Sequence, residues 1–451
     1  MRFDRFSLLA SIPALVFCLI AFVAQSVQAA SISLLRDPDI EHGLSRLAAP
    51  VLRAAGLNAK RVRILVVNDQ SLNAFVIDSR TIFVHHGLLL KLTTPEMLQA
   101  VIAHEAAHIT NGHLARRMQN MQSTNTAIGV GMALAVLAAA AGSKEAATGL
   151  AVGTQSSAIR RFLSHTRAEE SSADRSAAAF LNAAGISPRG LVEVHRIFAG
   201  QEVLSQANQD PYMRSHPLSR DRMRAAEAYM AQYGDRGQPS ADTQYWFARL
   251  RGKLSAFTRA PKWTLRRAKE ETHRDIRLMR EAIAHHRRRD MKKALSAINK
   301  ALAIRPNDAF YHELKGQILM ENRQWAAARS AYGRAVQLAP SDALTLASYG
   351  RAQLANDQPK AALKSMERSR GIDFRNAALL RDMSQAYAKT GQMGQAALVT
   401  AERYALLGRL EDAGRHAKRA SALLPRGSAG WRRAQDILVA YEQSEKRKRR
   451  R

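Results

Sequence analysis

Cysteine is almost absent from this chain of 451 residues, which contains a single one, Cys18. Because one cysteine cannot form an internal disulfide, the fold has to be stabilised by other means. Thiolate metal ligands are excluded beyond that position, so any metal site must be built from histidine and carboxylate side chains. Uninterrupted apolar runs of about 20 residues, the length that a transmembrane helix needs, are missing as well.

The N-terminal segment has the pattern of an export signal. Arg2 and Arg5 precede an apolar run over residues 8–24, and Val27-Gln28-Ala29 has small residues at the positions that a signal peptidase requires. We expect residues 1–30 to be a cleaved signal peptide and the protein to be exported. A retained membrane anchor is the alternative, but the apolar run is short and contains a proline.

Acidic residues are scarce relative to basic ones, with 38 Asp and Glu against 68 Lys and Arg, and the net charge is +30. Most of this excess lies after residue 260. An exported protein meets anionic lipid headgroups and acidic polypeptides, so we favour such partners and expect no nucleic acid. The basic tail, residues 441–451, is expected to be disordered. The alternative is that this tail contacts a membrane surface.

The first half of the chain, residues 31–260, predicts one domain that is mainly helical. Residues 63–68 and 81–85 are rich in β-branched and aromatic side chains and predict a small sheet. A long helix is expected from Thr94, with Pro95 in its first turn. Residues 127–153 form two apolar arms around a polar break, which predicts a buried or interfacial helical hairpin or, alternatively, one that dips into a membrane.

The second half of the chain contains an internal repeat. Pro306 and Pro340 end similar helical patterns 34 residues apart, and Met291, Trp325 and Pro359 share another phase of the same period. This period is typical of tetratricopeptide repeats. We therefore predict an α-solenoid of such repeats over residues 261–440.

The segment His-Glu-Ala-Ala-His at residues 104–108 carries the strongest chemical signal. Two histidines at i and i+4 of a helix project from the same side, so His104 and His108 can reach one zinc ion. Glu105 would lie beside the metal without binding it, where it can act as the general base and acid of peptide hydrolysis. The alternative is a chance match on an exposed helix, and the apolar residues around the segment argue against it.

A catalytic zinc site needs a third protein ligand. A third histidine at the spacing of the metzincins is missing after His108. Glu169 and Glu170 form an acidic pair in the helical stretch downstream, and only Glu170 stands four residues before Asp174. Both side chains would then share one helix face, with Glu170 able to bind the metal and Asp174 able to hydrogen-bond a ligand histidine.

These motifs carry a family resemblance. His104 to His108, the segment Thr-Arg-Ala-Glu-Glu-Ser-Ser-Ala-Asp at 166–174, and Asn73-Ala74-Phe75 followed by Ile-Phe-Val-His-His-Gly-Leu-Leu resemble the gluzincin family of HtpX and the CAAX prenyl protease. The signal segment and the repeats resemble its exported members, so the similarity extends over the whole mature chain. The resemblance implies a gluzincin-type metallopeptidase domain in which Glu170 is the third zinc ligand.

A second motif of the same family is His-Pro-Leu-Ser-Arg-Asp-Arg at residues 216–222. The resemblance implies that His216 approaches the zinc ion, either as a fourth ligand in a resting state or as a group that stabilises the transition state. Arg222 would anchor the loop. The alternative is that His216 is only a turn residue held by Pro217.

Substrate contacts are expected along the strands before the long helix. If residues 82–85 form an edge strand, an extended substrate can pair with it, and we predict Asn73, Phe75, Ile82 and Val84 to contact that substrate. The resemblance implies a periplasmic zinc endopeptidase of envelope quality control. Its partners would be unfolded or stalled outer-membrane β-barrel proteins and their assembly machinery. A chaperone or adaptor without proteolysis and a membrane-integral peptidase anchored by residues 127–153 are the alternatives.

Overall fold

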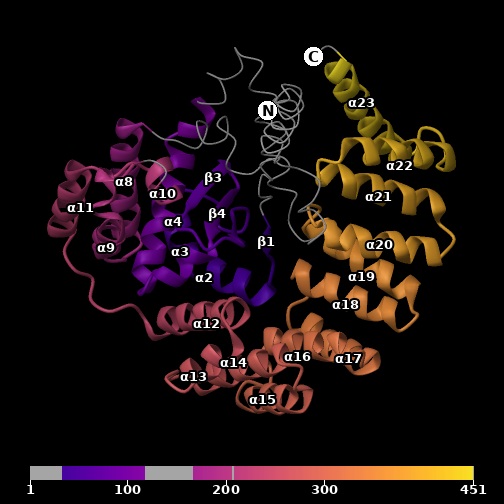
Figure 1. The fold of residues 1–451 in the computed structure, drawn as a ribbon, viewed down its shortest axis with the longest axis horizontal. Coiled ribbons are helices and arrows are strands. Elements are labelled where there is room, and N and C mark those ends of the chain that lie inside the picture. The colour runs from indigo at the N-terminus through magenta and orange to yellow at the C-terminus, as the bar shows by residue number, and fades with distance from the viewer. Residues whose placement is uncertain (1–32, 117–165, 206–207, 450–451) are drawn as a thin grey trace, which may run out of the picture.

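The computed structural model describes residues 33–116, 166–205 and 208–449. A small sheet with helices packed around it forms one part of the molecule, and antiparallel helix pairs form the other (Figure 1). The pairs follow an arc, so that the C-terminal helices lie across from the sheet. The predicted signal segment, the apolar segment 127–153 and the last two residues of the chain lie outside the described residues.

The sheet has four described strands in the order β1-β2-β4-β3. Their bounds are Leu34–Leu35 for β1, Arg63–Val67 for β2, Ala74–Asp78 for β3 and Thr81–His85 for β4. Strands β2 and β4 are parallel, whereas β1 pairs with β2 and β3 pairs with β4 in the antiparallel sense. The β3–β4 hairpin is closed by Asp78, whose carboxylate accepts a 2.7 Å hydrogen bond from the backbone N–H of Arg80.

The position of β4 corrects one prediction. Substrate pairing with residues 82–85 required these residues to form an edge strand, but β4 lies between β2 and β3 and pairs on both sides. The reason is that residues 74–78 are themselves a strand, which folds back on β4 through the short turn after Asp78. Among the described strands, the outer one next to β4 is therefore β3, and its other edge pairs with none of them. Ile82 and Val84 are fully buried and pack into the core, so they cannot touch a chain paired at the edge.

Helices surround the sheet and share one hydrophobic core with it. They are α2 (Pro38–Ala54), α3 (His86–Lys91), α4 (Pro95–Thr110), α8 (Arg167–Ala183), α9 (Arg189–Phe198), α10 (Pro211–Ser215) and α11 (Arg220–Tyr233). The 3-10 helix at Gln201–Val203 lies between α9 and α10 in the chain and has no buried residue. Helix α4 runs through the middle of this core, and 13 of its 16 residues are buried. The helix predicted to carry the His-Glu-Ala-Ala-His segment is thus held on nearly all sides, which favours a fixed site.

Helix α12 (Ala241–Thr258) connects the two parts of the molecule. Its Leu250 and Leu254 belong to the core around the sheet, whereas Tyr245 and Ala256 belong to the first core of the helix pairs. Helix α13 (Pro261–Ala268) follows directly. The boundary proposed near residue 260 therefore falls at the end of a helix that both parts share.

The remaining helices pair in the order expected for a solenoid. They are α14 (Arg274–Arg287), α15 (Met291–Ile304), α16 (Ala309–Glu321), α17 (Trp325–Leu338), α18 (Ala343–Ala355), α19 (Pro359–Ile372), α20 (Ala377–Lys389), α21 (Met393–Leu406), α22 (Leu410–Leu423) and α23 (Ala429–Arg449). Met291, Trp325 and Pro359 each begin the second helix of a pair, 34 residues apart. The predicted fold class, a mainly helical chain with a small sheet and a solenoid of tetratricopeptide repeats, is confirmed.

The turns inside these pairs repeat with the same period. Arg289, Arg323, Asp357 and Gly391 lie at equivalent turns, and each has a positive φ between 54° and 77°. A left-handed residue at this position ends the first helix and lets the second fold back against it. Only the last of the four is the glycine that such a position favours.

Ion pairs join the solenoid to the sheet. Asp373, at the end of α19, accepts hydrogen bonds from Arg36 at 2.8 Å and from Arg63 at 2.9 and 3.0 Å. Burial would raise the pKa of Asp373, but the two guanidinium groups outweigh it and lower that pKa. Arg36 also pairs with Glu41 on α2. We call these four residues the clasp.

The C-terminal segment differs from its prediction. Helix α23 continues to Arg449, so most of the segment expected to be disordered is helical. Its Glu, Gln, Lys and Arg residues have high helix propensity, and they extend a helix that already packs against α22.

Within the described ranges, no helix is both long enough and apolar enough to cross a membrane.

Candidate functional site

The first two residues of the site are positioned by α4. Thr94 caps the helix by accepting a hydrogen bond from the backbone N–H of Met97, and Pro95 occupies the first turn, where its missing N–H is harmless. One turn apart on this helix, His104 and His108 point to the same side. Their Nε2 atoms are 3.0 Å apart, and both side chains are buried.

The two glutamates of the acidic pair on α8 have different roles. Glu169 closes a capping box with Thr166 at the start of the helix. Glu170 is instead fully buried, with Oε2 lying 3.3 Å from Nε2 of His104 and Oε1 lying 3.3 Å from Nε2 of His108. The structure therefore brings Glu170, and not Glu169, to the two histidines.

His216 completes the cluster from a different element. It follows α10, and its Nδ1 lies 3.0 Å from Oε1 of Glu170 and 3.3 Å from Nε2 of His104. Its backbone N–H donates a 2.7 Å hydrogen bond to the carbonyl of Tyr212, whose ring packs on the imidazole at 4.6 Å. On the other side of the ring, Nε2 lies 3.2 Å from the carbonyl oxygen of Ala74 on β3.

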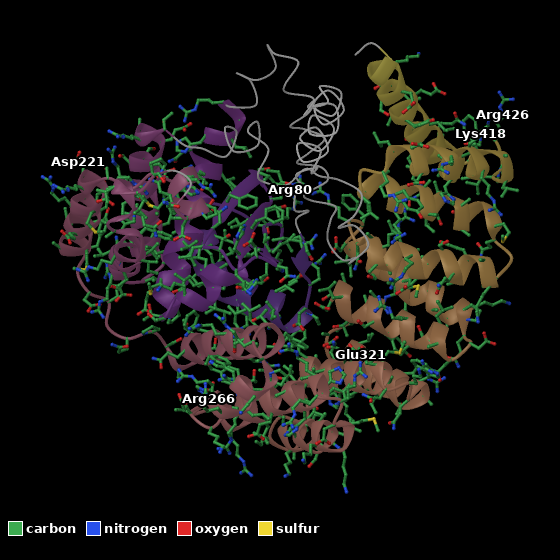
Figure 2. All side chains as sticks on the ribbon, viewed as in Figure 1. Arg80, Asp221, Arg266, Glu321, Lys418 and Arg426 are labelled. Atoms are coloured by element: carbon green, nitrogen blue, oxygen red, sulfur yellow. The ribbon has the colours of Figure 1, made fainter. Side chains whose placement is uncertain are left out.

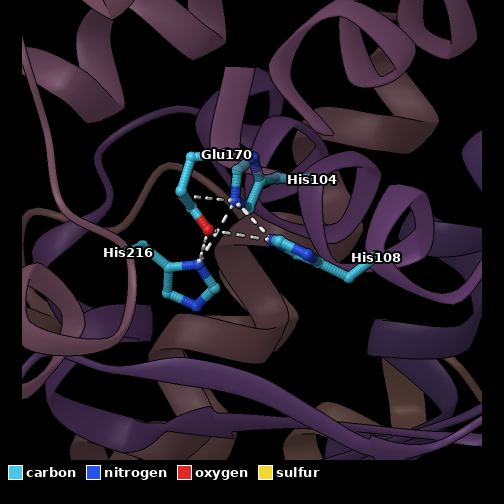
Figure 3. A group of neighbouring side chains, drawn as sticks. All are labelled: His104, His108, Glu170 and His216. Atoms are coloured by element: carbon cyan, nitrogen blue, oxygen red, sulfur yellow. Dashed lines mark hydrogen bonds and ion pairs between the residues drawn. The ribbon is translucent and has the colours of Figure 1, made fainter. Parts of the chain in front are cut away.

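Four potential ligand atoms thus converge, from His104, His108, Glu170 and His216 (Figure 3). All lie within 4.8 Å of one another. Zinc bonds of about 2.0–2.1 Å in a tetrahedron place neighbouring ligand atoms about 3.3 Å apart. Five separations between these side chains, taken over both oxygens of Glu170, are 3.0 to 3.3 Å and are close to that value. The four side chains therefore fit a single metal ion.

The outward nitrogens of both α4 histidines have partners of their own, so Nε2 is the nitrogen of each ring that faces the cluster. Nδ1 of His104 lies 3.0 Å from Oδ1 of Asp174, a carboxylate that can only accept when ionised. Nδ1 of His108 lies 2.9 Å from Nδ1 of His113. Partners of this kind orient ligand histidines and select the tautomer whose inner nitrogen carries the lone pair.

Arg222, on α11, contacts Asp174, Glu170 and the loop that carries His216. Two of its nitrogens lie 2.6 and 2.9 Å from the carboxylate of Asp174, and a third lies 2.8 Å from Oε2 of Glu170. It also donates a 2.8 Å hydrogen bond to the carbonyl of Pro217, which fixes the loop that carries His216. Because Arg222 binds Oε2, the other oxygen of Glu170 is the one that faces His108 and His216.

Glu105 lies beside the cluster and differs from the other acids. It is fully buried, and burial raises the pKa of its carboxyl group. Neither of its oxygens accepts a hydrogen bond within the part of the chain that the structure describes, although Nε2 of His216 is 3.5 Å from Oε1. By contrast, burial of Glu170 is outweighed by the nearby charges of His216 and Arg222, which hold the pKa of Glu170 well below its usual range.

The four residues predicted to contact substrate lie at different positions relative to the sheet. Asn73 lies near the cluster, where its side-chain oxygen accepts a 3.3 Å hydrogen bond from the hydroxyl of Ser215. Phe75 lies on β3 and stacks on Phe83 at 5.2 Å. Ile82 and Val84 lie on the internal strand, as described above.

The sequence analysis missed His113 and His195. His113 is buried against His108, and Nε2 of His195 lies 3.7 Å from Oδ1 of Asp174. The sequence does contain a signal for His113, because a glycine precedes it and glycine commonly ends a helix. In the structure Gly112 has a φ of 68° and turns the chain back at the end of α4. His195 stands on α9 without any sequence motif that could have connected it to the site.

Comparisons with known proteins agree with this geometry. Residues 35–230 match the family described as peptidase family M48. The chain is 25% identical over 399 residues to the beta-barrel assembly-enhancing protease of Yersinia pestis, covering 85% of this chain and 79% of the relative. It is 24% identical over 398 residues to the protein of that name from Escherichia coli strain K12, with the same coverage.

Among solved structures, a crystal structure of MamA matches 38% of this chain and 97% of its own length, at 17% identity and a TM-score of 0.29.

The family match spans the sheet and both helices that carry the metal-binding cluster. The predicted enzyme class is thereby confirmed, and a metal cofactor is implied. Residues 35–230 of this chain therefore form a metallopeptidase domain that matches peptidase family M48.

Proposed function

We propose that this protein is a zinc-dependent endopeptidase of cell-envelope quality control, which degrades misassembled outer-membrane proteins and assists their assembly. The observation that carries the proposal is the convergence of His104, His108 and Glu170 beside Glu105, whose carboxylate accepts no hydrogen bond from the described residues. The name shared by the two relatives supports the connection to β-barrel assembly.

Zinc is the proposed metal because the donor set consists of imidazole nitrogens and one carboxylate. In our assignment His104, His108 and Glu170 are the three permanent ligands. Zinc bound there would polarise a peptide carbonyl and lower the pKa of a water molecule. Asp174 and Arg222 act by position, since they hold His104, Glu170 and the His216 loop in place.

Glu105 is proposed as the general base and acid. It is adjacent to the ligand His104 on α4, so it reaches the same space without joining the cluster. A carboxylate that has no hydrogen-bond donor among the described residues is available to accept a proton from water. It can then pass that proton to the leaving amine, as general acid–base catalysis requires.

His216 is proposed as a fourth ligand in a resting state. Its Nδ1 is as close to Glu170 and His104 as those two are to each other, which supports a ligand more than a distant stabilising group. A catalytic zinc site needs one open position. The loop that carries His216 therefore has to move before a peptide carbonyl can approach.

Substrate is proposed to pair with the free edge of β3. An extended peptide adds to such an edge through backbone hydrogen bonds, and no side-chain sequence is required for that pairing. The carbonyl of Ala74 on this strand already binds His216, so the edge leads directly to the cluster. Of the predicted contacts, Asn73 directly precedes this strand and Phe75 lies on it. The ring of Phe75 is buried, as are the side chains of Ile82 and Val84, so only the backbone of this strand is available to such a chain.

We further propose that residues 1–30 are removed on export to the periplasm and that residues 31–260 and 261–440 are the functional domains. The solenoid would bind stalled barrel proteins or their assembly machinery. A second candidate function is a chaperone or adaptor without proteolysis. It is favoured by one observation, namely that His216 fills the fourth ligand position.

The test compares Glu105→Gln with Glu96→Gln, the same substitution on the same helix but in its first turn. The substrate is a purified outer-membrane barrel protein kept unfolded. General acid–base groups contribute roughly 10²- to 10⁴-fold, so Glu105→Gln should lower the cleavage rate by about that factor while Glu96→Gln leaves it unchanged. Equal rates in both variants would contradict the proposal. Cleavage by neither the wild type nor His216→Ala would favour the chaperone.

A further inference from the structure

Positive charge is concentrated where α12 passes into the helix pairs. Residues 259–293 contain 13 Lys and Arg against 5 Asp and Glu. The segment thus has a surplus of 8 positive charges, which lie on α13, on α14 and at the start of α15. None of the groups in the proposed peptidase site lies in this segment.

Many of these cations are exposed and unpaired. Within the described residues the following side chains are exposed and have no ion-pair partner, and we call them the basic rim: Arg259, Lys262, Arg266, Lys269, Arg274, Arg288, Arg289 and Lys292. The acids of the segment do not neutralise them. Glu270 pairs with Arg267, and Asp275 is buried, where it binds Arg305 and two tyrosine hydroxyls.

Two hydrogen bonds connect the turns that carry parts of the basic rim. Arg287, at the end of α14, donates hydrogen bonds to the carbonyl of Ala256 at 2.8 Å and to the carbonyl of Arg259. These bonds hold the α14–α15 turn against the turn between α12 and α13. Figure 2 shows Arg266 on the outer side of the molecule, away from the sheet. The cations of α13 and those of the α14–α15 turn thus belong to the same outer edge.

Beneath this surface Arg280 pairs with Glu271, whereas the charge of Arg251 is not compensated by an ion pair among the described residues. Arg251 on α12 donates to the carbonyl of Leu90 and has no carboxylate partner among the described residues. Its neighbour Gly252 lies beside the aliphatic stem of Arg280. Burial lowers the pKa of Arg251, and the charges of Arg280 and Arg267 lower it further. Repulsion of this kind would be relieved by an external anion.

We propose that the basic rim binds the anionic phospholipid headgroups of a membrane surface. Helix α13 has the composition of an interfacial segment, with Thr264 and Ala268 buried inward, cations outward and the half-buried Trp263 between Lys262 and Thr264. The proposed location in the envelope supplies such a surface. The rim then fixes how the peptidase faces the membrane in which its barrel substrates assemble, and to that extent it rests on the proposed function.

Charge reversal tests whether lipid binding depends on the basic rim or on the positive charge of the protein in general. Lys262→Glu/Arg266→Glu reverses two rim charges four residues apart on α13. Lys360→Glu/Lys364→Glu is the matched control, because these exposed lysines are also four residues apart, on α19, and have no ion-pair partner among the described residues. Binding is measured by cosedimentation with vesicles of phosphatidylcholine and phosphatidylglycerol, and with vesicles of phosphatidylcholine alone, at physiological salt.

The wild type and the control variant should bind the anionic vesicles alike. Each basic residue near such a surface contributes about 1 kcal/mol, so the rim variant should bind at least about tenfold more weakly. Charges more than about 10 Å from the lipid are screened, which is why the control should change little. No wild-type binding, equal binding to the neutral vesicles, or equal loss in both variants would overturn the proposal.

Two further measurements distinguish a loss of lipid binding from unfolding of the variant and from a loss of peptidase activity. Thermal unfolding followed by circular dichroism shows whether each variant is folded. Glu105→Gln should bind vesicles as the wild type does, and the rim variant should cleave unfolded substrate at the wild-type rate without lipid, so failure of the peptidase proposal is seen separately. If the rim variant loses binding to acidic casein but keeps vesicle binding, the surface belongs to acidic polypeptides and the membrane proposal is wrong.

Discussion

Nε2 of His216 lies 3.2 Å from the main-chain oxygen of Ala74, so one imidazole touches both the metal-binding cluster and the edge strand. Its other nitrogen faces Glu170 at 3.0 Å. A substrate that paired with β3 would compete for the carbonyl that His216 uses. Pairing of substrate and opening of the fourth ligand position are therefore coupled in our account.

This coupling predicts the behaviour of His216→Ala. Three ligands remain, and the carbonyl of Ala74 becomes free, so cleavage of an unfolded barrel protein should become faster while bound zinc is retained. The rate is followed by gel electrophoresis under single-turnover conditions. A slower reaction with intact zinc would instead assign His216 to stabilisation of the transition state.

Asp174→Asn should weaken metal binding. The substitution removes a negative charge that faces Nδ1 of His104 and pairs with Arg222. Loss of such a supporting partner typically lowers metal affinity by about 10- to 100-fold. Competition with a zinc chelator measures the effect. Asp221→Asn on α11, where the side chain is exposed (Figure 2), is the control that should bind zinc as the wild type does; equal affinities for all three proteins would refute the role of Asp174.

Much of this site follows from local sequence patterns. The spacing of His104 and His108 and the i, i+4 relation of Glu170 to Asp174 are properties of single helices, and helix geometry determines which face they share. The 34-residue period was readable for the same reason, because each repeat contacts its neighbours in sequence.

Other features depend on contacts between distant segments, which no local pattern records. The edge status of β3 depends on which strands pair, and the strand at residues 74–78 was not recognised. His195 reaches Asp174 only through the packing of α9. The contacts of Asp373 with Arg36 and Arg63 bring together residues more than 300 positions apart. The helical C-terminal segment was missed because its charge was given more weight than its helix propensity.

The clasp makes a prediction about domain arrangement. In Asp373→Asn the guanidinium groups of Arg36 and Arg63 lose their shared carboxylate, and breaking a buried ion pair costs about 3 kcal/mol. The solenoid should then move more freely, which small-angle X-ray scattering detects as a larger radius of gyration. Asp357→Asn, an exposed position in the same solenoid, should leave the radius unchanged. An unchanged radius in Asp373→Asn would show that other contacts hold the parts together.

Glu313 predicts a pH dependence of stability. Burial raises the pKa of this glutamate on α16 to about 8, although the nearby Lys253 lowers it. Its unfolded pKa is about 4.3, so the folded protein holds a proton that the unfolded chain releases. Stability from this group is therefore fully present below about pH 4.3 and is lost as the pH rises through about 8.

Glu313→Gln should remove this dependence, because the amide resembles the protonated acid. Between about pH 6 and about pH 9, the Tm of the wild type should fall more steeply than that of the variant. Calorimetry measures both curves, and Glu281→Gln on α14 should follow the wild type. Parallel curves for wild type and Glu313→Gln would show that Glu313 titrates normally in the folded protein.

The central claim is that His104, His108 and Glu170 hold one catalytic zinc ion, and zinc content per chain tests it most directly. Mass spectrometry of the purified proteins should find one zinc per chain in the wild type and in Glu105→Gln, and a large loss in Glu170→Ala. Circular dichroism shows that each protein is folded. Full zinc content in folded Glu170→Ala would contradict the assignment.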